Sequence, residues 1–164
     1  MTLTTHAAIA AAVAKPFLTF NPVIAFFVGV ASHYLSDAIP HWDYSLHSVD
    51  HEHKGKDHIV WHFGARSFVI DIARIASDAL LGALLVYVIA RPQSLHEALP
   101  LAAAIIGGIL PDFLQGVYFT KKADFLKPLQ KFHDTMHTKI KLGPYPAIGI
   151  PFQLAILLFS LWVL

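Results

Sequence analysis

The chain has 164 residues, a length that suits a single domain, and we expect residues 1–164 to form one. Hydrophobic residues make up 55% of the chain and charged residues only 14%, which argues against an ordinary soluble domain and indicates lipid as part of the solvent. The formal net charge of +1 argues against a nucleic-acid partner. Cysteine is absent, which excludes disulfides and thiolate ligands. Histidine is in excess, with 11 residues, so we expect a bound metal to have nitrogen and oxygen ligands.

The first apolar segment runs from Ala7 to Ala14 and is rich in alanine, the strongest helix former. Thr4 or Thr5 is available as its N-cap. At about 1.5 Å per residue the segment is too short to cross a hydrocarbon core about 30 Å thick. The pair Lys15–Pro16 ends it.

A second apolar helix is predicted from Val23 to about Ala38. Asn21 and Pro22 precede it, the residue types preferred as the N-cap and the first residue of a helix. Two short helices joined by a tight connection make a helical hairpin, so both of its outer ends return to the same membrane face.

Three longer apolar segments follow and are predicted to span the membrane: Arg66–Ala90, Leu99–Phe119 and Tyr145–Leu164. A polar segment, Pro40–His62, precedes the first of them, and a basic segment, Thr120–Leu142, which we expect to hold a short surface helix, separates the last two. The fold class predicted is therefore an all-α integral membrane bundle of four to five helices, the N-terminal hairpin plus three spanning segments.

Lysine is distributed unequally between the two sides of this topology. The two long polar segments must share one face, and the opposite face has only Lys15 and Arg91 as basic residues. The long segments hold Lys54, Lys56, Lys121, Lys122, Lys127, Lys131, Lys139 and Lys141. The positive-inside rule places that face in the cytoplasm, for a multi-pass protein of the inner or plasma membrane.

The ionisable residues of the membrane region gather at that same face. Charged groups inside a bilayer are costly, so they usually face one another or a cavity and mark function. The residues concerned are His6, His33, Asp37, His41, Asp43, Asp71, Arg74, Asp78, Asp112, His133 and His137. Six or more histidines and aspartates from five segments, converging on one face, indicate a bound cation.

The spacing of these residues also suits coordination. His33 with Asp37, and His133 with His137, are separated by four residues, which places two ligands on one face of a helix. Each residue alone also has an ordinary explanation, since a single helical histidine is more often hydrogen-bonded than metal-bound. Arg74 could form an intrahelical ion pair with an aspartate three or four residues away. The loop histidines from position 47 to 58 fit a solvated segment.

Several short motifs resemble a known family. They are Thr5–His6, the run from Ser32 to Asp43 with its H-x-x-x-D-x-x-P-H core, Gly108–Asp112, and the segment holding His133 and His137. In this order along the chain they resemble the DUF457-type, YdjM-like inner-membrane metal-dependent hydrolases. The core motif is also similar to a helix of zinc-dependent phospholipase C and the S1/P1 nucleases, where it supplies ligands to a zinc cluster. The resemblance implies a metal-dependent hydrolase that acts on phosphoesters.

The function predicted is hydrolysis of a phosphoester, with a lipid phosphoester as the favoured substrate and an anionic lipid as the partner in the bilayer. The metal ligands predicted are His6, His33, Asp37, Asp112, His133 and His137. Zn²⁺ is the favoured ion, with Mn²⁺ or Fe²⁺ as alternatives. The catalytic residues predicted are Asp37, His41 and Arg74. In this interpretation His41 or Asp43 is a further ligand or orients one, and Arg74 binds the substrate phosphate.

Two other functions remain open at this point. A metal or proton transporter also uses intramembrane histidine and aspartate, but it needs polar groups that continue to the opposite face, and the sequence lacks them there. A non-catalytic membrane scaffold with a structural metal would have a closed site of four ligands, whereas an enzyme keeps an open position.

Overall fold

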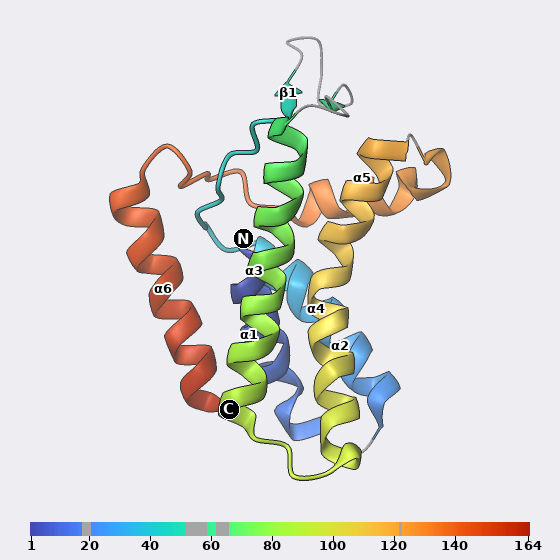
Figure 1. Ribbon diagram of the computed structural model, residues 1–164, viewed down its shortest axis with the longest axis vertical. Coiled ribbons are helices and arrows are strands. Elements are labelled where there is room, and N and C mark those ends of the chain that lie inside the picture. The colour runs from blue at the N-terminus through green and yellow to red at the C-terminus, as the bar shows by residue number, and fades with distance from the viewer. Residues whose placement is uncertain (18–20, 52–58, 62–65, 122) are drawn as a thin grey trace.

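The computed structural model describes residues 1–17, 21–51, 59–61, 66–121 and 123–164. The described part of the chain is almost entirely helical, as the sequence predicts (Figure 1). Its α-helices are α1 (Leu3–Ala14), α2 (Pro22–Asp37), α3 (Arg66–Ala90), α4 (Leu95–Lys121), α5 (Lys127–Met136) and α6 (Pro146–Val163). Two 3₁₀ turns, η1 (Lys15–Phe17) and η2 (Asp124–Leu126), precede α2 and α5. The all-α prediction is confirmed, with a small hairpin added.

That hairpin lies in the first long polar segment, where only a loop is predicted. Strand β1 (Val49–His51) pairs antiparallel with β2 (Ile59–Trp61), so that Asp50 lies opposite Val60. Positions 53, 58 and 62, three of the histidines in the predicted polar loop, lie outside the described residues.

Helices α3, α4 and α6 are each long and apolar enough to cross a membrane. Their outward side chains are large and apolar, and Leu80, Phe113 and Trp162 are among the most exposed. Because such surfaces are stable only against other apolar groups, lipid is the solvent that suits them. The chain is therefore a membrane protein. Helix α4 begins four residues before the predicted segment, and it continues through two prolines, Pro100 and Pro111.

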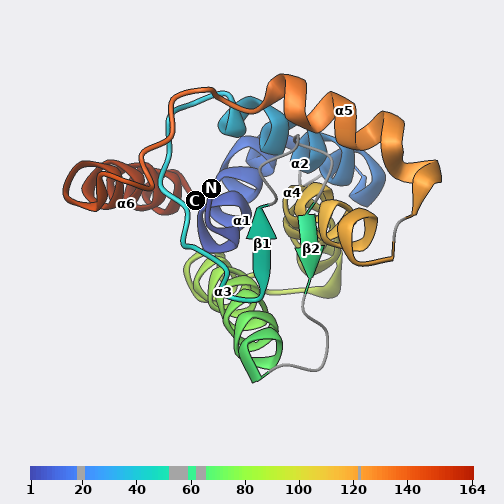
Figure 2. The same cartoon turned by 90° about the horizontal axis from the view of Figure 1, so that it is seen from above.

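Helix α1 lies in the centre of the bundle and contacts α2, α3, α4 and α6 (Figures 1 and 2). Five of its alanines, Ala7, Ala8, Ala10, Ala11 and Ala14, have no exposed surface. Alanine allows neighbouring helices to approach closely, which suits a helix enclosed on all sides. The first helix of the N-terminal helical hairpin, α1, thus lies in the core.

The closest helix pair is α2 with α4. A Cβ atom at Gly29 would collide with the carbonyl oxygen of Ala104, and one at Gly107 would collide with that of Phe26. Only glycine permits this approach, which is the small-residue packing characteristic of membrane helices. The contact fixes the distance between the two helices that carry Asp37 and Asp112.

The two helices of the hairpin begin differently. Asn21 caps α2 as predicted, because its Oδ1 accepts the Val23 N–H at 2.7 Å. The predicted cap of α1 is wrong, since Thr4 and Thr5 lie inside the helix. Instead, the Asp78 carboxylate of α3 accepts the backbone N–H groups of Leu3 (2.7 Å) and Thr4 (3.1 Å). A partly buried carboxylate from another helix thus replaces the local hydroxyl cap.

The two long polar segments meet at one end of the bundle (Figure 1). The Thr138 N–H donates to the Asp37 carbonyl oxygen at 2.7 Å, and the Leu142 N–H donates to that of His41 at 3.2 Å. His41 and Lys141 also form an isolated parallel bridge. These contacts place the end of α2 beside the segment that follows α5.

Candidate metal centre

The Asp37 carboxylate lies at the centre of a cluster of histidines. It ends α2 and is almost fully buried. His6 Nε2, from α1, lies 3.1 Å from Asp37 Oδ1. His33 Nε2, one turn earlier in α2, lies 3.2 Å from Oδ2, and His133 Nε2, from α5, lies 3.0 Å from the same oxygen. Three helices therefore direct imidazole nitrogens at one carboxylate.

Asp112 of α4 closes the opposite side of the cluster. Its carboxylate oxygens lie 3.8 Å from His6 Nε2, 3.6 Å from His33 Nε2 and 3.8 Å from His133 Nε2. Ligands about 2.0–2.2 Å from a tetrahedral zinc ion are roughly 3.3 Å apart, so these separations suit atoms that share one cation. His33, Asp37, Asp112 and His133 form such a group. Asp112 is 25% exposed, so the group is open on one side.

Hydrogen bonds to the outer ring nitrogens determine where the protons lie. His33 Nδ1 lies 2.7 Å from the Gly108 carbonyl oxygen and His41 Nδ1 lies 2.7 Å from that of Ile39. A carbonyl oxygen can only accept, so both Nδ1 atoms carry the proton. The Ser36 hydroxyl donates to the His33 carbonyl oxygen and therefore accepts from His6 Nδ1. In a ring that carries only this one proton, Nε2 is left with a free lone pair.

These lone pairs lie in a buried site and face anions. His6 Nε2, His33 Nε2 and His41 Nε2 are buried and have no hydrogen-bond partner in the described chain. A lone pair directed at a carboxylate is repelled by it, and an unpaired buried polar atom is costly. Protonating both His6 and His33 would place two cations in rings stacked at a centroid distance of 4.0 Å. A divalent cation between nitrogen and oxygen satisfies all of these atoms.

A second set of ligands adjoins the first and shares Asp37 with it. Asp37, His41 and His137 form this group. His41 Nε2 lies 3.9 Å from Asp37 Oδ1 and 3.2 Å from Asp43 Oδ2. Burial lowers the pKa of His137, which favours the neutral ring that a metal requires. The Met1 ammonium group lies 2.8 Å from Asp43 Oδ1 and 3.4 Å from Asp37 Oδ1.

The structure brings five of the six predicted metal ligands, and His41, into these two adjoining groups. The sixth predicted ligand, His6, lies beside the first group, with its Nε2 3.1 Å from Asp37 Oδ1. Arg74, the predicted phosphate ligand, is exposed, and its Nη1 contacts the Ser45 carbonyl oxygen at 3.4 Å rather than the cluster. The two aspartates near it in α3 also bind elsewhere. Asp71 accepts the Ser48 N–H and hydroxyl, both at 2.7 Å, and Asp78 caps α1. The intrahelical ion pairs that their spacing allows are absent among the described residues.

The roles of three supporting groups were not predicted from the sequence. Ser36 and the Gly108 carbonyl orient the rings of His6 and His33, and Asp78 holds the start of the helix that carries His6. A weak signal existed for Ser36, which lies between two predicted ligands of one helix. None existed for Gly108, because a backbone carbonyl has no side-chain signature.

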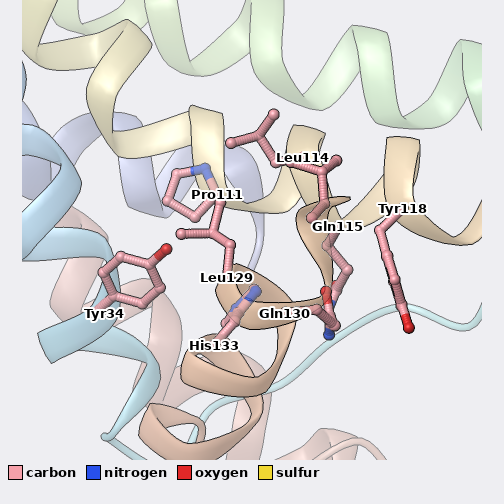
Figure 3. A pocket seen from close by; sticks show the side chains of 9 residues that line it. Tyr34, Pro111, Leu114, Gln115, Tyr118, Leu129, Gln130 and His133 are labelled. Carbon is pink, nitrogen blue, oxygen red and sulfur yellow. The ribbon is translucent and has the colours of Figure 1, made fainter. Parts of the chain in front are cut away.

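A small pocket opens beside His133, between α2, α4 and α5 (Figure 3). It is a narrow, partly open hollow with room for about one water molecule. Apolar and polar side chains mix in its wall, which is formed by Tyr34, Pro111, Leu114, Gln115, Tyr118, Leu126, Leu129, Gln130 and His133. The pocket therefore gives a water molecule access to the His133 side of the metal-ligand cluster.

The chain matches no model of a known protein family, no curated protein and no solved structure. The function is therefore argued from the site alone.

Proposed function

We propose that the protein is a membrane-bound, metal-dependent hydrolase that cleaves a phosphoester, with a lipid phosphoester as the favoured substrate. The observation that carries the proposal is the set of three buried histidine Nε2 atoms that lie beside Asp37 and its neighbouring carboxylates and have no hydrogen-bond partner in the described chain. That arrangement suits a divalent cation, with Zn²⁺ favoured and Mn²⁺ or Fe²⁺ as alternatives. Asp112, a quarter exposed, leaves one side of the site accessible to substrate.

The residues of the chain have distinct roles in this proposal. The principal metal is held by the first ligand group together with the neighbouring His6. That group consists of His33, Asp37, Asp112 and His133. When bound, a divalent metal lowers the pKa of a coordinated water and polarises the phosphoryl oxygen.

The second ligand group, His41 and His137 with the shared Asp37, holds a further ion or the water that attacks. Asp43 is half exposed and its carboxylate lies 3.2 Å from His41 Nε2, so it orients that ring beside the second ligand group. Arg74 is exposed and its Nη1 is directed at the Ser45 carbonyl oxygen rather than at the ligand groups. The proposal therefore assigns phosphate binding to the metal.

Access from the bilayer supports a lipid substrate. The outward faces of α3, α4 and α6 are apolar, and the pocket beside His133 has Leu114, Leu126 and Leu129 in its wall. A molecule with a phosphate head can place that head at the ligands while its apolar part remains against these surfaces. We further propose that the long-loop end faces the cytoplasm of a plasma or inner membrane, on the lysine distribution.

Ion transport is less well supported by the same structure. A transport path would continue through the other half of the bundle, where the buried residues include Ala10, Ala14, Ala25 and Ala104. No ionisable side chain is buried among them in the described chain. A dry alanine-rich core cannot carry an ion across.

The test is hydrolysis by protein reconstituted in lipid nanodiscs, assayed on a phosphomonoester lipid, a phosphodiester phospholipid and a soluble aryl phosphate. We expect turnover of at least one lipid substrate that is lost with a chelator and restored by Zn²⁺ or Mn²⁺. Asp37→Asn should reduce turnover by more than about 100-fold, because even residues that only orient metal ligands can contribute about that much.

Asp71→Asn is the matched control, since Asp71 is also a buried aspartate but binds Ser48 outside the cluster. It should keep metal-dependent turnover. Absence of metal-dependent turnover across the whole panel would overturn the proposal, and full activity in Asp37→Asn would overturn the assignment of the site.

A further inference from the structure

Helix α5 presents three different surfaces around its circumference. Gln130 and His133 form the inner surface and are its buried residues. Lys127, Lys131 and Thr135 are exposed and lie along one flank, because 3.6 residues make a turn. Leu129 and Phe132, at i and i+3, lie along the other exposed flank. The helix therefore has an apolar side that the described chain covers only in part.

The apolar flank continues into the turn before the helix. Phe125 of η2 is 80% exposed, and Phe132 is 49% exposed although its ring makes an edge contact with Tyr34. A largely exposed phenylalanine just before α5 and a half-exposed one within it are costly in water. The flank consequently requires an apolar partner.

The orientation of α5 shows what that partner can be. Helix α5 crosses the bundle near the end where the long segments meet, rather than running parallel to the spanning helices (Figures 1 and 2). With ten residues it is about 15 Å long and cannot span a bilayer. A helix with this orientation, apolar on one flank and lysine-bearing on the other, has the character of an interfacial helix.

We propose that α5 docks on an anionic membrane surface, with Phe125, Leu129 and Phe132 among the upper acyl chains and Lys127 and Lys131 on the lipid phosphates. Two observations favour a bilayer over another macromolecule. The exposed surfaces of the spanning helices already require lipid around the same molecule. The lysines beside the apolar flank complement anionic headgroups, and lysine near such a surface is attracted to it.

This docking links the bilayer to the metal-ligand cluster. Helix α5 carries His133, whose Nε2 lies 3.0 Å from Asp37, and it ends at His137. The other residue on its inner surface, Gln130, donates to Asp134 in the same helix at 3.0 Å and so does not tie α5 to the bundle. In this proposal the membrane and the cluster hold two different sides of α5, so that a change in how α5 sits on the membrane acts on His133 as well. The inference does not depend on hydrolysis.

The test uses the absence of cysteine, which allows single nitroxide labels in the full chain. Phe125→Cys and Phe132→Cys probe the apolar flank, Thr135→Cys is the matched control on the polar flank, and Leu158→Cys of α6 is the lipid-facing reference. Collision of each label with oxygen and with a water-soluble paramagnetic chelate is measured in nanodiscs of phosphatidylcholine with phosphatidylglycerol, and of phosphatidylcholine alone.

We expect labels at 125 and 132 to resemble the Leu158 reference, with oxygen contact at least several-fold favoured over the chelate, and the label at 135 to show the reverse. The contrast should decrease in phosphatidylcholine alone. Equal chelate contact at 125 and 135 would overturn the proposal, as would dipolar broadening between labels at 125, which would show a second copy on this flank. Two apolar-flank probes keep the test valid if Phe132→Cys fails to fold.

Discussion

The two ends of the bundle bury opposite kinds of residues. At the end where the long segments meet, the buried side chains include His6, His33, Asp37 and His133. At the other end they are mostly apolar, and they include the Ala14, Ala25 and Ala104 group. Helix α1 belongs to both, because it begins with buried Thr4, Thr5 and His6 and continues in alanine.

This difference indicates that the apolar end stabilises the fold and that the end with the histidines carries the function. Close packing of alanine and glycine needs no polar group, and it is enough to explain how the apolar end of the bundle is held together. Burying several imidazoles around a carboxylate opposes folding unless every polar atom is satisfied. The buried histidines and aspartates at the other end are therefore explained by a bound ligand that satisfies their polar atoms.

The largest effect on folding is expected at the α2–α4 contact. Gly107→Ala should lower the free energy of unfolding by about 1–3 kcal/mol, because the added methyl group overlaps the Phe26 carbonyl and forces the helices apart. Denaturation of purified protein in detergent measures this change.

Gly116→Ala is the control in the same helix, since nothing lies within 4 Å of its added methyl group. Helix propensity alone predicts that Gly116→Ala will be neutral or stabilising by up to about 1 kcal/mol. Equal stability of the two variants would show that the apolar half is not held by this close approach.

A smaller loss of stability is expected when the carboxylate of Asp78, which caps the start of α1, is removed. Asp78→Ala leaves the N–H groups of Leu3 and Thr4 without their acceptor, which should cost about 1–2 kcal/mol of unfolding free energy. Asp78→Asn keeps one acceptor oxygen and should lose less. Both variants should retain bound metal, because Asp78 contacts neither ligand group. A loss of metal in Asp78→Asn, measured beside its unfolding midpoint, would place Asp78 in the site instead.

Most of the fold could be predicted because it depends on local patterns. Apolar length identifies the spans, and the Asn21–Pro22 pair marks the start of α2. The start of α1 could not be predicted, because its cap comes from Asp78, which lies more than 70 residues away in the chain. Capping rules consider only neighbouring residues, so they favoured a threonine.

For the candidate site, the sequence predicts how far along its helix each residue lies, but not the direction in which its side chain points. A rise of about 1.5 Å per residue gives the level of each ligand along its helix, and this was enough to gather the histidines and aspartates at one end. The direction of a side chain around the helix depends on how neighbouring helices pack. Arg74 lies at the level of the predicted site yet turns outward to Ser45, and Asp71 turns to Ser48.

The central claim is that the histidine–aspartate cluster holds a divalent metal, and metal content measures it directly. Wild-type protein, His33→Ala and His96→Ala are loaded with Zn²⁺, freed of excess and compared by elemental analysis, with circular dichroism to confirm folding. His96 is the control because it is an exposed histidine of α4, outside both ligand groups. We predict at least one zinc ion per chain in wild type and His96→Ala, and little in folded His33→Ala. Equal zinc content in all three proteins, or none in wild type, would contradict the account.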